Sequence, residues 1–174
     1  MKLSFFLKNP VFLFLIKLLL LYLLWYLVYE LWLHPQEVAD IFVVKQTIGA
    51  GKKILELCGY EVFSNGFRMI GIKNTSGLIM GDNCNGISLF ALFSGFVIAF
   101  PGPVIKKTVF IVLGILSIQL LNIIRVVAIA IMETYSYEMT EFNHTYTFTI
   151  LIYGYVFLLW ILWVNKFSLV SIRK

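Results

Sequence analysis

Long runs of hydrophobic residues, interrupted by few polar ones, dominate the chain. A stretch of about 20 apolar residues is long enough to cross the hydrocarbon core of a bilayer as a helix. Four stretches approach this length, and the second is the shortest: residues 11–33, 85–100, 108–132 and 147–164. The pattern predicts an all-α integral membrane protein, a four-helix transmembrane bundle that forms a single domain over residues 1–174.

The segment between the first two predicted spans, residues 34–83, has a different pattern. Apolar residues at helical spacing predict an amphipathic helix over residues 35–57, which the stretch Gly49-Ala50-Gly51 could break. Asn65-Gly66 then separates two short apolar runs, which is typical of a β-hairpin. We therefore expect a small cap, an amphipathic helix plus a hairpin, over one end of the bundle.

Composition supports the membrane interpretation. The chain is 60% hydrophobic and only 13% charged, and its mean hydropathy is +0.91. A water-soluble domain of this size needs more polar surface. The net charge of +5 does not indicate nucleic acid, because basic residues gather beside the predicted spans: Lys2, Lys8, Lys106, Lys107, Lys166, Arg173 and Lys174. We expect the lipid bilayer, and no nucleic acid, as a partner.

The same basic residues predict the orientation. Lys and Arg near span ends are enriched on the cytoplasmic side. With four spans, the three basic clusters share one side, whereas all nine acidic residues, Asp82 among them, fall on the other. We therefore expect a multi-pass protein of the cell (inner) membrane with both termini cytoplasmic and an extracytoplasmic cap. The first span exceeds a signal-peptide core in length and lacks a small-residue cleavage site, so a retained anchor is expected.

Cys84 is the first residue with candidate chemistry. It lies at the start of the second predicted span, in the sequence GDNCNGISLF. Unpaired N–H groups and the helix dipole favour an anion such as a thiolate at this position. Two other interpretations stay open: a structural cysteine at a helix cap, and a disulfide with Cys58, which follows the predicted cap helix.

Arg125 is the second candidate. It follows Gln119 and Asn122 on one face of the third predicted span, close to that span's outer end. An arginine within hydrocarbon is costly unless it is paired or reaches a wet cavity, and snorkelling to the headgroups is the alternative. We expect a polar cavity, with Asn122 holding the guanidinium in place.

His144 is the third candidate, because the predicted topology places it level with Cys84 and near Arg125. A thiolate can attack a carbonyl, an imidazole can move the proton, and a guanidinium can stabilise the oxyanion. His34 is expected to be a solvated or interfacial residue. The sequence has no His-Glu-x-x-His and no Cys-x-x-Cys pattern, so neither a metal nor another cofactor is expected.

The second predicted span also carries small residues at every fourth position, Ala91, Gly95 and Ala99. Such a face lets another helix approach closely. We expect the partner to be the third span of the same bundle, and a bound substrate helix is the alternative.

Three short motifs together resemble the exosortase/archaeosortase family: NCNGI around Cys84, NIIRV with Asn122 and Arg125, and NHTY with His144. The resemblance covers roughly residues 60–160, and the short chain is similar to the small exosortase branch called XrtF. Larger members carry additional N-terminal spans. Asn85 stands where a small residue, Ala or Ser, is more usual.

The resemblance implies a membrane cysteine peptidase or transpeptidase that cleaves C-terminal sorting signals of exported proteins at the outer membrane face. Cys84, Arg125 and His144 are then the expected catalytic residues, and Asn122 and Asn85 the supporting ones. The acceptor stays open between water and a lipid or glycan nucleophile. The alternative function is a non-catalytic polytopic membrane protein that serves as an assembly partner.

Overall fold

The computed structural model describes residues 9–81 and 84–168. Five residues of the orientation argument lie outside these ranges: Lys2, Lys8, Asp82, Arg173 and Lys174. The described chain is mostly helical, and three helical stretches are long and apolar enough to cross a membrane: Pro10–Gln36, Val104–Glu133 and Thr140–Phe167. The protein is therefore a multi-pass membrane protein.

The second predicted span is shorter than a full crossing. Helix α4 (Ile87–Ala99) has 13 residues, which corresponds to about 20 Å at 1.5 Å per residue, whereas α5 (Val104–Glu133) has 30. The bundle therefore consists of three helical stretches of spanning length and one shorter apolar helix. Because α4 is shorter than α5, the start of α4 lies alongside α5 and not at the C-terminal end of α5.

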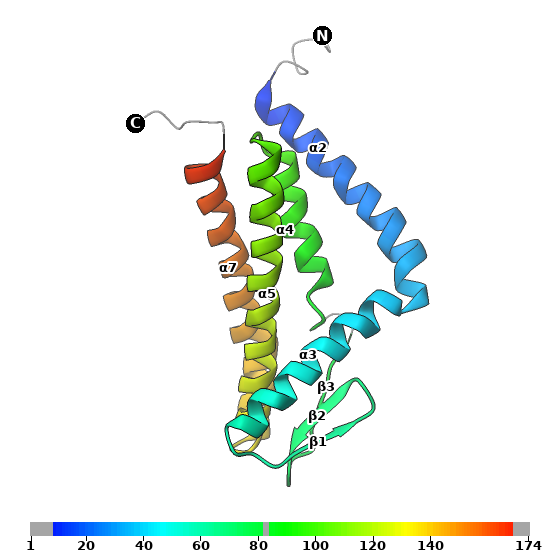
Figure 1. Cartoon of the computed structure of the whole chain (residues 1–174), viewed down its shortest axis with the longest axis vertical. Helices are drawn as coiled ribbons and strands as arrows, with labels where there is room; N and C mark the ends of the chain where they lie inside the picture. Colours follow the sequence, from blue (N-terminus) through cyan, green and yellow to red (C-terminus); the bar gives the residue numbers. More distant parts are fainter. Residues whose placement is uncertain (1–8, 82–83, 169–174) are drawn as a thin grey trace.

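Helix α2 (Pro10–Trp25) begins where its sequence provides a cap. The side chain of Asn9 accepts a hydrogen bond from the Val11 N–H at 3.0 Å, and Pro10 occupies the first helical position. The helix continues through π-helical turns at Tyr26–Leu33 and a short 3-10 turn at His34–Gln36. In Figure 1, α2 starts close to α4 and diverges from it towards α3.

Helices α4, α5 and α7 (Phe148–Leu162) pack around a buried apolar cluster, which consists of Phe93, Val97, Ile118, Val156 and Trp163. Gly114 makes the close approach of α4 and α5 possible, since a Cβ there would lie 2.2 Å from the Phe93 ring. The expected contact of the small-residue face with α5 is therefore wrong for Ala91 and Gly95. Both residues instead line a cavity beside α2, because the large side chains of α4 face α5.

The cap segment folds as helix α3 (Val38–Leu57) and a three-stranded antiparallel sheet of β1 (Val62–Asn65), β2 (Met69–Ile72) and β3 (Leu78–Ile79). Asn65 pairs with Met69 across the turn that contains Gly66. Helix α3 is continuous through Gly49–Gly51, so the considered break does not occur. Gly51 is buried and faces Val126 of α5, where an added Cβ would lie at an ordinary contact distance of 3.6 Å.

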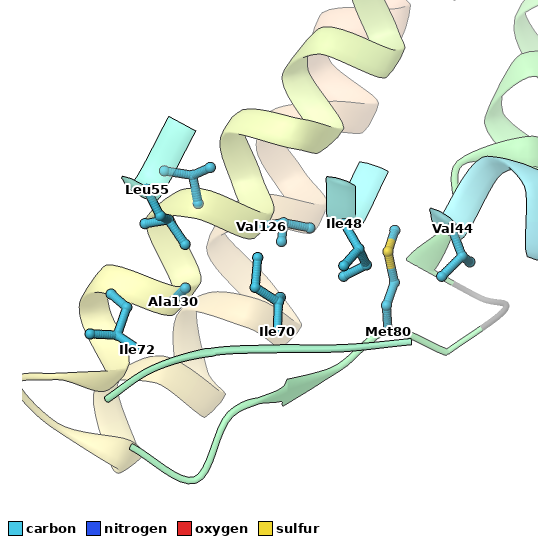
Figure 2. Close-up of a cluster of buried hydrophobic side chains, with 9 residues drawn as sticks. Val44, Ile48, Leu55, Ile70, Ile72, Met80, Val126 and Ala130 are labelled. Carbon is cyan, nitrogen blue, oxygen red and sulfur yellow. The ribbon is translucent and has the colours of Figure 1, made fainter. Parts of the chain in front are cut away.

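An apolar cluster holds this cap against α5 (Figure 2). It joins side chains from α3, the sheet and the C-terminal half of α5, namely Val44, Ile48, Leu55, Ile70, Ile72, Met80, Val126, Val127 and Ala130. Cys84 packs against the edge of the same cluster. The cap therefore forms one wall of the region around Cys84.

Candidate active site

Cys84, Arg125 and His144 come from three different elements and meet in one place. Cys84 lies three residues before α4, Arg125 lies on α5, and His144 lies in the π-helical turn Asn143–Thr147 that leads into α7. The Cys84 Sγ is 3.6 Å from His144 Nε2. Arg125 Nη2 donates to the Cys84 Sγ at 3.9 Å and to the His144 carbonyl at 3.4 Å. The three residues predicted from sequence are thus in mutual contact.

The backbone around Cys84 is fixed by its own neighbours. Gly86 adopts a left-handed conformation with φ of 88°, which a glycine tolerates without strain. The Asn85 side chain accepts a hydrogen bond from the Ile87 N–H at 2.8 Å and so satisfies the first N–H of α4. The thiol therefore projects from a tight turn that its own neighbours hold in place.

Asn122 supports this turn in a way that differs from the expectation. Its amide nitrogen donates to the carbonyls of Cys84, at 3.1 Å, and of Asn85, at 3.3 Å. Among the described residues, the Asn122 side chain has these two hydrogen bonds and none with the Arg125 guanidinium. A buried amide at this position fixes the distance between α5 and the cysteine turn. Asn122 therefore holds Cys84 in place, and it does not hold Arg125.

A buried carboxylate lies behind the cysteine turn, and the sequence reasoning missed it. Asp40 is 0% exposed. Its Oδ1 accepts hydrogen bonds from Asn85 Nδ2 and from the Tyr29 hydroxyl, both at 2.5 Å. His34 Nδ1 lies 3.2 Å from its Oδ2. The His34 side chain is 37% exposed, which is compatible with the expected solvated or interfacial residue, but it also pairs with this buried acid.

A sequence signal for Asp40 did exist. The buried face of α3 repeats at helical spacing, and Asp40 is the first member of this stripe, which continues through Val44, Thr47, Ile48, Gly51 and Leu55. A carboxylate on an otherwise buried stripe needs polar partners from another element. Periodicity thus marks Asp40 as unusual, although it does not name Asn85 or Tyr29 as its partners.

The polar stripe on α5 divides among three partners. Gln119 Nε2 donates to Thr47 Oγ1 of α3 at 2.7 Å. Asn122 reaches the cysteine turn, and Arg125 reaches the thiol. No described carboxylate lies within ion-pair range of Arg125, so its charge is directed at the site. The stripe therefore both holds α3 against α5 and supplies a cation beside Cys84.

Two cavities flank the thiol. The larger, about 300 Å³, is bordered by Cys84, Arg125 and His144 together with residues of α4 and α7, among them Ser88, Leu89 and Tyr153. The smaller, about 40 Å³, lies under the cap and shares the same three polar residues. A substrate carbonyl that enters the larger cavity can contact the thiol, the imidazole and the guanidinium.

Cys58 does not belong to this site. It is exposed at the end of α3, and neither cysteine is in a disulfide. Among the residues described, no three His, Cys, Asp or Glu side chains are grouped as ligands of one metal ion. The chemistry available in the cavity is therefore that of a thiol, an imidazole and a guanidinium.

Comparison with known proteins identifies the family. The family model of transmembrane exosortases, of the EpsH type, matches residues 3–165. The chain belongs to the transmembrane exosortase family. No curated protein and no solved structure matches it.

Membership of the exosortase family confirms the resemblance at the family level. It implies a membrane-embedded transpeptidase or protease of the cysteine type that acts on sorting signals. The substrates of the family are exported proteins with C-terminal sorting signals. The match covers Cys84, Arg125 and His144.

Proposed function

We propose that this chain is a cysteine peptidase or transpeptidase that cleaves the C-terminal sorting signal of exported membrane proteins at the extracytoplasmic face, like the small XrtF-type exosortases. The observation that carries the proposal is the contact of the Cys84 thiol with His144 Nε2 at 3.6 Å, beside the Arg125 guanidinium. A nucleophile, a proton acceptor and an oxyanion donor within reach of one cavity form a complete set for acyl transfer.

In the first step, His144 Nε2 accepts the Cys84 proton, and the thiolate attacks the scissile carbonyl carbon. Arg125 stabilises the resulting oxyanion. The intermediate then collapses, its C–N bond breaks, and the imidazolium returns the proton to the leaving amine. The products of this step are a thioester on Cys84 and a released segment with a new amino terminus.

In the second step, His144 takes a proton from the acceptor, whose oxygen or nitrogen attacks the thioester carbonyl. The C–S bond breaks, and the thiolate recovers the proton through His144. Water as acceptor makes the protein a protease, and a lipid or glycan hydroxyl or amine makes it a transpeptidase. Asn85 and Asn122 contribute by holding the cysteine turn in place throughout both steps.

The proposed topology agrees with this chemistry. With both termini cytoplasmic, the three residues lie near the extracytoplasmic end of the bundle, Arg125 about two turns before the end of α5. A sorting signal that anchors its protein by a transmembrane helix presents the residues before that helix at this level. The scissile bond then meets Cys84 without the substrate helix leaving the membrane.

Mass spectrometry of membrane-protein C-termini tests the proposal directly. We compare cells that lack the protein with cells that carry the wild type, Cys84→Ala or Cys58→Ala at matched levels. We expect new C-termini, shortened or linked to an added group, with the wild type and Cys58→Ala only. If the C-termini are the same in all four strains, the non-catalytic assembly role replaces the enzymatic one.

A further inference from the structure

A second and larger cavity lies on the other side of α4. It has a volume of about 610 Å³ and opens between α2 and α4, with Leu15, Leu19, Tyr22, Ala91, Leu92 and Gly95 among its lining residues. Its lining is mostly apolar, as expected for a surface that meets hydrocarbon or another helix, with Glu30 and Ser88 among its polar members. We call this cavity the α2–α4 groove.

The α2–α4 groove is continuous with the candidate active site. Ser88, Leu89 and Tyr153 line both the groove and the cavity that contains Cys84. Towards the opposite end of α4 the two helices close on each other, where the ring of Phe14 lies 5.5 Å from that of Phe96 and 5.7 Å from that of Phe100. The groove therefore has a closed end and an end that leads to the thiol.

The wall that α4 presents to the groove is adapted to a close neighbour. A Cβ added at Gly95 would have no atom within 4 Å, whereas one at Gly114, on the packed α4–α5 side, would meet Phe93. Ala91 and Gly95, one turn apart, thus form an open wall of small residues. Walls of this kind let helix backbones approach closely in membranes.

We infer that the α2–α4 groove seats the transmembrane helix of the exported client, parallel to α4. This inference rests on the proposed function. The client's helix follows its scissile bond, so its first turn must lie beside Cys84. Helix α4 begins at Ile87, three residues after Cys84, and runs away from it along the groove. A client helix in the groove therefore places the bond that precedes it at the thiol.

The length of the groove supports this assignment. Ile87, the first residue of α4, and Gly95 are separated by about 12 Å along the helix at 1.5 Å per residue, so roughly two turns of a client helix can pack against this side of α4. Lipid acyl chains and a second copy of this chain are the other occupants that an apolar groove admits. Of these occupants, only the client helix carries the scissile peptide bond that Cys84 must attack in the first step.

Site-specific photocrosslinking identifies the occupant. A benzophenone amino acid replaces Leu92, which lines the groove and is 42% exposed, or Leu158 on α7, which is 62% exposed and outside the groove. Both proteins carry Cys84→Ala, so that clients stay uncleaved. We expect position 92, and not 158, to crosslink the C-terminal apolar segment of an exported protein. Adducts with lipid alone, with a second copy of this chain, or equally at both positions would overturn the inference.

A pair of glycine variants supplies the functional test. Gly95→Leu fills the groove, while Gly154→Leu places the same side chain on α7, where the Cβ likewise has no atom within 4 Å. We expect Gly95→Leu to lower the rate of client processing at least about tenfold, equivalent to roughly 1.4 kcal/mol, and Gly154→Leu to leave it unchanged. Alkylation of Cys84 at the wild-type rate in Gly95→Leu shows that the site is intact.

The two proposals fail in different ways. Wild-type cells could process a client that does not crosslink at position 92 and that Gly95→Leu processes at the wild-type rate. In that case the groove is not the binding site of the client helix, and the proposed function stands. If no membrane protein changes its C-terminus, the proposed function fails. Crosslinking of an exported protein's C-terminal helix at position 92 would still support the groove as its binding surface.

Discussion

The fully buried carboxylate of Asp40 accepts a hydrogen bond from Asn85, the residue that follows Cys84 in the chain. Asn85 in turn accepts a hydrogen bond from the N–H of Ile87, the first residue of α4. The cap helix α3 and the nucleophile are therefore connected by one polar chain, which ends at Tyr29 and His34 on the first membrane-spanning stretch.

This connection predicts a positional role for Asp40. Asp40→Leu leaves Asn85 and Tyr29 without their buried acceptor, and each unsatisfied group costs about 1–3 kcal/mol. We expect lower thermal stability in detergent and a loss of client processing. Asp40→Asn keeps an oxygen for both donors, and it should process its client faster than Asp40→Leu does.

The rate of Cys84 alkylation separates position from global stability. If Asp40 positions the cysteine turn, the alkylation rate in Asp40→Leu changes at temperatures where the protein remains folded. A wild-type alkylation rate together with wild-type processing would show that the chain from Asp40 to Asn85 does not affect the site.

The gross arrangement of helices could be predicted from sequence because long apolar runs have few alternatives in a membrane. The length of α4 could not, since an apolar run does not show whether its first residues continue a helix or form a turn. Asn85 and Gly86 are the residues that decide this, Asn85 through its hydrogen bond with the Ile87 N–H and Gly86 through a positive φ.

The meeting of Cys84, Arg125 and His144 was predicted from their shared membrane level, which is a property of topology. Their supporting contacts were not predictable in the same way. Asn122 could reach either the guanidinium or the cysteine turn from its place on α5, and only the packing of α4 against α5 selects the turn. Polar partners within a membrane depend on which elements pack together.

The state of the thiols gives a second prediction. Cys58 is exposed and Cys84 half-buried, and neither forms a disulfide. We expect two alkylatable thiols in the denatured protein both before and after reduction, and a faster reaction of Cys58 in the folded protein. Mass spectrometry of the alkylated peptides measures both. New thiols that appear only after reduction would indicate a Cys58–Cys84 bridge instead.

Gly114 gives a prediction on stability. An added Cβ would lie 2.2 Å from the ring of Phe93, and overpacking of this kind typically costs about 1–3 kcal/mol. We expect Gly114→Ala to lower the temperature of thermal unfolding in detergent. Gly154→Ala, where the Cβ has no atom within 4 Å, serves as the matched control. Equal unfolding temperatures for the two variants would contradict the close packing of α4 on α5.

The orientation is tested by reporter fusions. The basic residues beside the spans predict that a reporter after Lys174 is cytoplasmic and that one inserted between Asn74 and Thr75, in the turn before β3, is extracytoplasmic. Enzymatic reporters that are active on only one side of the membrane measure both. A cytoplasmic signal from the insertion would place the cap, and Cys84 with it, on the wrong side for exported clients.

The role of Arg125 is tested by separating charge from geometry. If the guanidinium stabilises an oxyanion, lysine is a poor substitute, because a compact ammonium lacks the planar fork and has a different reach. Loss of a well-placed oxyanion donor costs about 10²–10³ in rate. We expect Arg125→Lys to accumulate normally and to process its client at least about tenfold more slowly, a conservative bound within that range, and Arg125→Ala to be slower still.

The matched control for Arg125 is membrane insertion itself. Arg125→Ala removes a charge from an apolar helix and therefore should not impair insertion, so client cleavage is compared at equal protein levels. A side chain that only snorkels to the headgroups would be replaced by lysine without consequence. Wild-type cleavage rates in Arg125→Lys would therefore remove Arg125 from the mechanism and leave its 3.9 Å contact with the Cys84 Sγ as a packing contact.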